Sequence, residues 1–161
     1  MIRGILLSFS VIVCFSACAP QFTVENPDTC PVTAPSQGTS SLPATIVYEG
    51  RFWFGTSALW TNLPTDGIWR GLPQEGDGYV QKTVFWREGY VAIDEPNPEL
   101  IVSGRQLDAP SKTFSFSDAT HGWDETGDFM LMGISIPTEG CWEIAAEYQE
   151  VQLTYVVEIV P

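Results

Sequence analysis

The C-terminal part of the chain alternates between apolar and polar side chains, and this pattern constrains the fold more than any other feature. The run 142–148 places Trp, Ile, Ala and Tyr on one side, and the run 151–159 places Val, Leu, Tyr, Val and Ile on one side. A period of two is that of a β-strand with one buried face. Gln149 and Glu150 separate the two runs, so we expect them to form an antiparallel hairpin.

From residue 44 onward the chain consists of short apolar or aromatic runs separated by turn residues, without a sustained helical period. These runs are 45–48, 51–54, 58–63, 68–70, 79–87, 100–107, 112–116 and 129–136. Turns are expected at 65–67 and 74–78, and loops at 94–98 and 118–128. With the hairpin, this spacing predicts an all-β domain at 44–161, an antiparallel, immunoglobulin-like β-sandwich of about eight strands. A β-barrel is the alternative.

The long run at 79–87 alternates less cleanly than the C-terminal hairpin. One of its faces carries Val80, Val84 and Trp86. Lys82 interrupts this apolar face, and Phe85 interrupts the polar face opposite. We expect the face with Trp86 to pack in the core, because a large apolar ring is most often buried.

The N-terminus has the composition of a secretory signal. Arg3 precedes an apolar run at 5–15 that is too short to span a bilayer, and Ser16 and Ala17 then stand directly before Cys18. Residues 1–17 resemble a bacterial lipoprotein signal, in which the chain is cut before the cysteine and diacylglycerol is attached to its sulfur. We expect lipidation at Cys18 and an extracytoplasmic, lipid-anchored protein. Plain secretion and an uncleaved anchor are the alternatives.

Residues 18–43 follow this signal without any apolar period. They contain five prolines with Ser and Thr between them, so we expect an extended tether between the lipid and the domain. The far half of the tether would lie on the domain if Cys30 forms a disulfide.

The four cysteines sort by position. Cys14 lies inside the signal and Cys18 is the lipidation candidate, which leaves Cys30 and Cys141 as a pair in an oxidising compartment. We therefore expect a disulfide between Cys30 and Cys141. Two cysteines and the single His121 are too few for a zinc site.

The charge balance bounds the partners. Twenty acidic residues stand against seven basic ones, a formal net charge of −13. A surface with this excess of negative charge repels the phosphate backbone of nucleic acids. We therefore expect no nucleic-acid partner. Contact with the membrane would come from the lipid at Cys18 and not from a basic patch. An envelope protein or a glycan is the partner we expect at the cell surface.

Five segments of the chain form a recognisable series. They are Cys30-Pro31-Val32-Thr33, Ala58-Leu59-Trp60, Val84-Phe85-Trp86-Arg87, 104–110 (GRQLDAP) and 137–143 (PTEGCWE). In this order they resemble a family of small, uncharacterised bacterial secreted or lipoprotein domains with CPVT, ALW, GRRLDAP and PTEGCWE motifs. The resemblance covers Cys30 to the C-terminus. It implies a β-sandwich and supports the pairing of Cys30 with Cys141, and it implies no catalytic residues.

Two tryptophans beside turns are candidates for ligand binding. Trp69 and Trp123 are the rings most expected to be exposed, and exposed rings could stack on a carbohydrate or another small ligand. Asp124, Glu125 and Asp128 form an acidic loop whose oxygen atoms suit calcium. Apart from calcium, the sequence predicts no cofactor.

Nothing in the sequence singles out a catalytic residue. His121 has Ser115, Ser117 and Asp118 near it along the chain, but a triad depends on geometry and not on spacing. The leading hypothesis is therefore a non-enzymatic, lipid-anchored binding or structural module. The alternatives are a carbohydrate- or small-ligand-binding module that uses exposed aromatic rings, and a hydrolase that uses a pair of carboxylates.

Overall fold

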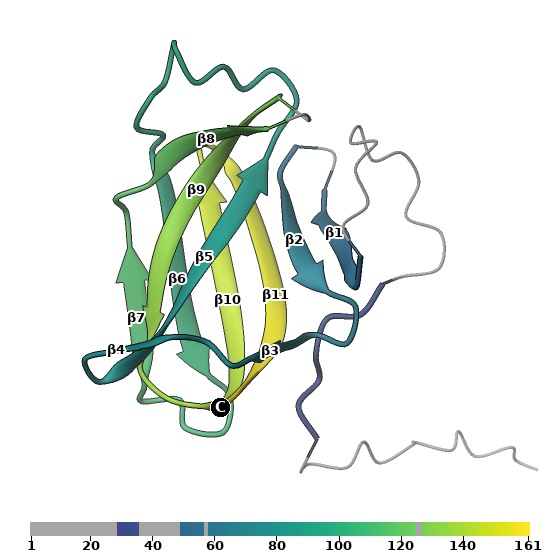
Figure 1. Ribbon diagram of the computed structural model, residues 1–161, viewed down its shortest axis with the longest axis vertical. Helices are drawn as coiled ribbons and strands as arrows, with labels where there is room; N and C mark the ends of the chain where they lie inside the picture. Colours follow the sequence, from purple (N-terminus) through teal and green to yellow (C-terminus); the bar gives the residue numbers. More distant parts are fainter. Residues whose placement is uncertain (1–28, 36–48, 57, 125–126) are drawn as a thin grey trace, which may run out of the picture.

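Two β-sheets face each other across an apolar core in the computed structural model of the chain (Figure 1). The structure describes residues 29–35, 49–56, 58–124 and 127–161. The expected signal at 1–17, Cys18, the expected strand at 45–48 and most of the tether lie outside the described residues. Among the described residues, no helix has the length and apolarity needed to cross a membrane.

Sheet A contains, in spatial order, β1 (Arg51–Gly55), β2 (Trp60–Pro64), β5 (Gly78–Trp86), β9 (Gly127–Ile136) and β8 (Thr120–Asp124), and β4 (Gln74–Glu75) pairs with β5. Sheet B contains β3 (Ile68–Arg70), β11 (Val151–Val160), β10 (Gly140–Tyr148), β6 (Leu100–Gln106) and β7 (Thr113–Phe116). All strand pairs are antiparallel except β3 with β11, which is parallel. The predicted all-β sandwich of two sheets is confirmed.

The described residues form eleven strands, more than the sequence predicted. One addition, β4, lies in the predicted turn at 74–78, where Gly76 adopts a φ of 62° and lets Gln74 pair with Tyr79. The other, β8, lies in the predicted loop at 118–128 and pairs with β9. An edge strand with polar residues can form because its partner strand supplies the backbone hydrogen bonds. Such a strand does not need apolar alternation, so its sequence does not predict it.

The C-terminal hairpin forms as predicted. Strands β10 and β11 pair in a register that places Ile144 opposite Tyr155 and Trp142 opposite Val157. The inward side chains of both strands are buried, and Gln149 adopts a φ of 54° in the connection. This hairpin forms the centre of sheet B.

Strand β5 buries the face opposite to the one predicted. Phe85 is fully buried and Thr83 nearly so, with the Thr83 hydroxyl donating to the Met132 carbonyl at 3.0 Å. Trp86 is only partly buried and points away from the core, so its predicted core position is wrong. Lys82 shares its face, and an amine without a partner is costly to bury. Burying Thr83 costs little, because its hydroxyl is hydrogen-bonded. This difference in the cost of burial decides which face of the strand meets the core.

The predicted disulfide between Cys30 and Cys141 is present, with a Cα–Cα distance of 5.4 Å. Residues 29–35 lie along β11, where the Thr33 amide donates to the Val156 carbonyl and the Val156 amide donates to Thr33 Oγ1, each at 2.9 Å. This part of the predicted tether therefore belongs to the domain surface. It pairs with β11 beyond the short β3.

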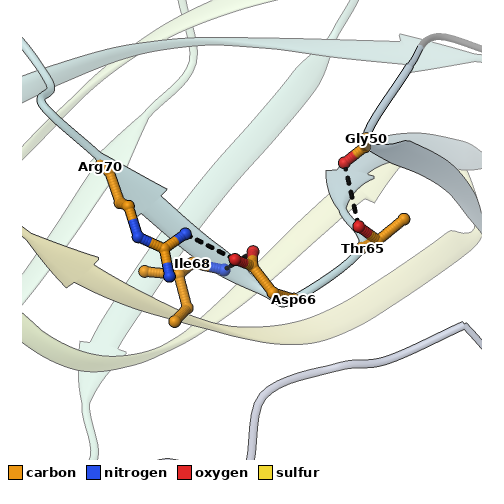
Figure 2. A network of polar contacts seen from close by, with 5 residues as sticks. All are labelled: Gly50, Thr65, Asp66, Ile68 and Arg70. Carbon is orange, nitrogen blue, oxygen red and sulfur yellow. Dashed lines mark hydrogen bonds and ion pairs between the residues drawn. The ribbon is translucent and has the colours of Figure 1, made fainter.

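The turn at 65–67 carries the chain from β2 in sheet A to β3 in sheet B, and Figure 2 shows its polar contacts. Asp66 accepts a hydrogen bond from the Ile68 amide at 3.0 Å. It also forms an ion pair with Arg70, whose Nη1 lies 2.5 Å from Asp66 Oδ2. These two contacts, the amide first, lower the pKa of Asp66. The Thr65 hydroxyl and amide both donate to the Gly50 carbonyl, which ties the turn to the start of β1. The turn therefore fixes where the β1–β2 hairpin stands.

Candidate functional site

The two tryptophans predicted to be exposed have different fates. Trp123 is 79% exposed, as predicted, on the edge strand β8. Trp69 is only 3% exposed, so its predicted exposure is wrong. Its strand β3 pairs with β11 and places Trp69 beside Ile159 on the core side of sheet B. A platform that combines both rings is therefore not formed.

The acidic residues proposed for calcium do not converge in the described part of the chain. Asp124 pairs with Gly127 and Trp123 with Asp128, so the two aspartates lie on opposite faces of the β8–β9 hairpin. Asp128 accepts a hydrogen bond from the Ala92 amide at 2.8 Å. Glu125 lies outside the described residues, within which no group of three metal-ligating side chains occurs. Calcium binding at this loop stays a prediction without support from its two described members.

The outer face of sheet A gathers aromatic, apolar and basic side chains. Alternation and register place these positions on it: Arg51, Trp53, Gly55, Trp60, Asn62, Pro64, Gly78, Val80, Lys82, Val84, Trp86, Thr120, Gly122, Asp124, Gly127, Phe129, Leu131, Gly133 and Ser135. The face opposite the core of a sandwich is usually polar, because water covers it. Four aromatic rings on one such face form an exception that needs an explanation.

A pocket opens on this face where β2 separates from β5. The two strands pair only at Trp60 with Trp86 and Thr61 with Phe85, while β5 continues along β9 for its whole length (Figure 1). The pocket has a volume of about 430 Å³. It is lined by Arg51, Trp53, Asn62, Gln81, Lys82, Val84, Asp124 and Phe129. Its size lies within the range of small-molecule sites, roughly 300–1,000 Å³.

Glycines allow two of the rings to lie close against neighbouring strands. A Cβ at Gly122 would come within 2.3 Å of the Phe129 ring, and one at Gly55 within 2.9 Å of the Trp60 ring. Each glycine is the register partner of its ring across the strand pair. An aromatic ring that covers a cross-strand glycine is a stabilising pair in sheets. The glycines therefore help to set the positions of rings on the outer face.

Arg51 is fixed at the pocket by a neutral partner. Its Nε donates to Asn62 Oδ1 and its Nη2 donates to the Asn62 carbonyl at 2.7 Å. Burial lowers the pKa of Arg51, although a guanidinium stays protonated at any ordinary pH. The amide nitrogen of Asn62 is buried and has no partner among the described residues. The wall of the pocket thus holds an oriented cation and an unsatisfied donor.

Lys82 adds a second cation. Its side chain is exposed, and it forms no ion pair within the described part of the chain. Across the strand pair stands Gly133, and nothing lies within 4 Å of a Cβ built there. Asp124 is the one carboxylate among the lining residues that the structure describes. With two cations and one carboxylate, the lining carries a formal charge of +1.

A second cluster, at the tip of the sandwich, fixes the loop between β5 and β6. Tyr148 donates to the Glu95 carboxylate, the Tyr90 hydroxyl donates to the Glu95 carbonyl at 2.9 Å, and Arg87 lies 5.4 Å from the centre of the Tyr148 ring. Burial, followed by the hydrogen bond to Glu95, raises the pKa of Tyr148 to about 12. His121 contacts the Pro96 carbonyl at 2.9 Å through Nδ1. These contacts bind the loop to both sheets.

Sequence reasoning missed the pocket although one signal for it was present. The sequence pattern predicts a core position for Trp86 and no particular role for Trp53, and Arg51 and Asn62 belong to no motif. Lys82 was the signal, because an amine in the middle of an apolar strand face indicates an outer face. An outer face with aromatic rings is a candidate interaction surface.

No family model, no curated protein and no solved structure matches the chain. The resemblance to small secreted or lipoprotein domains therefore stays a prediction from the motifs alone. Functional inference depends on the pocket itself.

Proposed function

We propose that the chain is a non-enzymatic, extracytoplasmic binding module that takes a carbohydrate in the pocket on the outer face of sheet A. The observation that carries this proposal is the composition of the pocket. Trp53, Val84 and Phe129 supply apolar surface, and amide and charged groups stand beside them. A mainly apolar hollow with a few placed polar groups is the usual form of a small-ligand site.

A sugar matches this lining because it has both kinds of surface. The C–H face of a pyranose packs against aromatic rings, and its hydroxyls need hydrogen-bond partners around the rim. Asn62 and Asp124, with the cations Arg51 and Lys82, offer both acceptors and donors for such hydroxyls. The aromatic surface proposed here replaces the pair Trp69 and Trp123, of which Trp69 is buried.

Binding without catalysis is the simpler proposal for this pocket. Glycoside hydrolysis uses two carboxylates that flank the scissile bond. The described lining contributes Asp124 alone. A carboxylate-dependent hydrolase therefore remains the second hypothesis and has no observation in its favour.

The location of the module at the cell surface is part of the proposal. Its support is the sequence pattern at 1–18, with a lipid on Cys18 holding the protein at a membrane. Cys18→Ser should abolish labelling by a radioactive fatty acid and release the protein from membranes. Retention on membranes by the variant would contradict the lipid anchor. The immunoglobulin-like strand arrangement is likewise a proposal, supported by two sheets of mainly antiparallel strands and tested by an experimental structure.

The ligand proposal is tested by titrating the purified protein with a panel of oligosaccharides while tryptophan fluorescence is recorded. We expect saturable binding to at least one of them and its loss in Trp53→Ala. Because Trp53 is buried, Val84→Gln provides a second variant at a partly exposed position that leaves the core intact. Thr154→Ala, on the outer face of sheet B, is the matched control. Binding that survives both pocket variants would contradict the proposal.

A further inference from the structure

We propose that the pocket selects acidic saccharides, with the sugar carboxylate held between Arg51 and Lys82. This inference depends on the proposed carbohydrate site and names the class of sugar that the site takes. Its basis is the distribution of charge over the whole chain. Four observations carry it, and each is independent of the aromatic rings.

The first observation is the scarcity of cations. Acidic residues outnumber basic ones by twenty to seven, so a cation on this protein has many carboxylates available as partners. Arg70 pairs with Asp66 and Arg105 with Glu143. Arg51, Lys82, Arg87 and Lys112 form no ion pair within the described residues. Of these four, Arg51 and Lys82 are distinguished because both line the same pocket.

The second observation is the state of Arg51. Its guanidinium is partly buried and uses two of its N–H groups on Asn62, which is neutral. A guanidinium has five N–H donors, so three are left for another acceptor. A partly buried cation that forms no direct ion pair within the described residues is unfavourable, and an incoming carboxylate would offset that cost.

The third observation is the orientation that Asn62 imposes. Two contacts from one residue hold the guanidinium in a fixed plane, and a fixed plane suits a carboxylate, which accepts two parallel N–H bonds. A neutral hydroxyl would not need such an arrangement. The site is thus prepared for a planar anion before the ligand arrives.

The fourth observation concerns Lys82 and Asp124. Lys82 stands opposite Gly133, which leaves the space beside the amine open to a ligand. Asp124 lowers the charge of the lining to +1, so the site suits one carboxylate per bound residue and disfavours a dianion such as phosphate. Sugar acids of the uronate type carry one carboxylate on each ring.

The test compares two trisaccharides of the same linkage, trigalacturonate and the neutral galactotriose, by isothermal titration calorimetry on the mature protein. We expect trigalacturonate to bind about tenfold more tightly or better at about 0.15 M salt, where a Debye length of about 8 Å screens the repulsion from the rest of the acidic surface more than the contacts at the pocket. At about 1 M salt, where the Debye length is about 3 Å, the preference should shrink. An aromatic carboxylate without a sugar, such as benzoate, tests whether the carboxylate alone is sufficient.

Lys82→Gln separates the role of the charge from folding, because the side chain is exposed. The affinity for trigalacturonate should fall by about fivefold, and that for galactotriose should not change. Lys82→Arg should restore the preference, and Lys112→Gln, which removes a cation from another part of the surface, should have no effect.

The outcomes are distinguishable. Equal affinities for the two sugars, or no response of the acidic sugar to Lys82→Gln, would overturn the carboxylate selectivity and leave the carbohydrate site standing. Binding of benzoate with no binding of either sugar would overturn the carbohydrate site. Absence of binding by all three probes would contradict both proposals.

Discussion

The outer faces of the two sheets differ in the residue types that they carry, although both sheets pack against the same core. The outer face of sheet A carries Trp53, Trp60, Trp86 and Phe129, and its two cations have no ion pair in the described residues. None of the described strand positions on the outer face of sheet B carries an aromatic ring. There Arg105 forms an ion pair with Glu143 across strands, and Gln152 donates a hydrogen bond to Glu147.

The proposed binding site on sheet A would account for this difference. On sheet B, Arg105 with Glu143 and Gln152 with Glu147 form cross-strand contacts, which are the ordinary way for a solvated antiparallel sheet to satisfy its polar groups. On sheet A the amide of Asn62 and the indole N–H of Trp60 are buried without partners among the described residues. The other two such atoms among the described residues, the Trp69 indole nitrogen and the Tyr155 hydroxyl, face the core from sheet B, so the outer face of sheet B has none.

The largest effect is expected from the disulfide, which fixes residues 29–35 to sheet B. Replacing Cys30 and Cys141 together by serine removes a link between residues 111 positions apart. The chain-entropy model puts the loss of unfolding free energy at about 4–5 kcal/mol. Urea denaturation of the protein and the variant measures it. In the folded variant, ligand affinity at sheet A should not change, and a loss of affinity would show that the two faces are coupled.

Trp53→Ala should have the next largest effect and should act on both stability and binding. Removing a ring that is only 6% exposed is expected to cost about 3 kcal/mol of unfolding free energy and to abolish saturable sugar binding. Thermal denaturation and fluorescence titration measure the two effects. Thr154→Ala on sheet B should change neither, and an equal loss of binding there would remove the distinction between the faces.

Alkaline pH should destabilise sheet B first. Its inner face carries Tyr148, whose pKa is raised to about 12, and Tyr155, whose pKa burial raises further. Because the folded pKa of Tyr148 lies above the ordinary value of about 10, its contribution is complete below pH 10 and is lost as the pH rises toward 12. Urea midpoints measured from pH 9 to about 12 should fall, and less steeply in Tyr148→Phe. An identical slope in the variant would contradict this role.

A smaller effect is expected at Gly133, which leaves the outer face of sheet A open beside Lys82. Gly133→Ala meets no atom within 4 Å, so it should stabilise the strand by about 0.5–1 kcal/mol. Chemical denaturation measures this gain. A destabilised variant would show that the face is more closely packed than the structure indicates.

The smallest effect is expected from the ion pair on sheet B. The side chains of Arg105 and Glu143 are 53% and 31% exposed, so Arg105→Gln should cost less than about 1 kcal/mol. Thermal denaturation in low and high salt measures it. A change in sugar affinity would contradict the assignment of this face to solvent.

The sequence was most informative where its pattern was local. The alternation at 142–159 predicted a hairpin that the structure contains, and the elimination of Cys14 and Cys18 predicted the pair that forms the disulfide. It was least informative where a segment depends on its neighbours. Trp69 follows a turn on a strand of three residues, and only its pairing with β11 places it in the core.

The candidate site shows the same limit more strongly. Strand β5 has apolar residues on both faces. A period of two in the sequence shows that alternate side chains lie on opposite faces, but it does not determine which face packs against the core. The orientation follows from Lys82 and from the hydrogen bond of Thr83 to Met132, which lies far along the chain. Arg51, Asn62 and Phe129 reach the same pocket only because β1, β2, β8 and β9 join one sheet.

The sequence alone determined that the described chain is made of strands, that its C-terminal runs form a hairpin and that Cys30 pairs with Cys141. Each of these follows from local alternation or from a count of cysteines. The tertiary structure alone decided which face of β5 is buried and which side chains line the pocket. Such choices depend on contacts between residues far apart in the sequence, which a local period cannot encode.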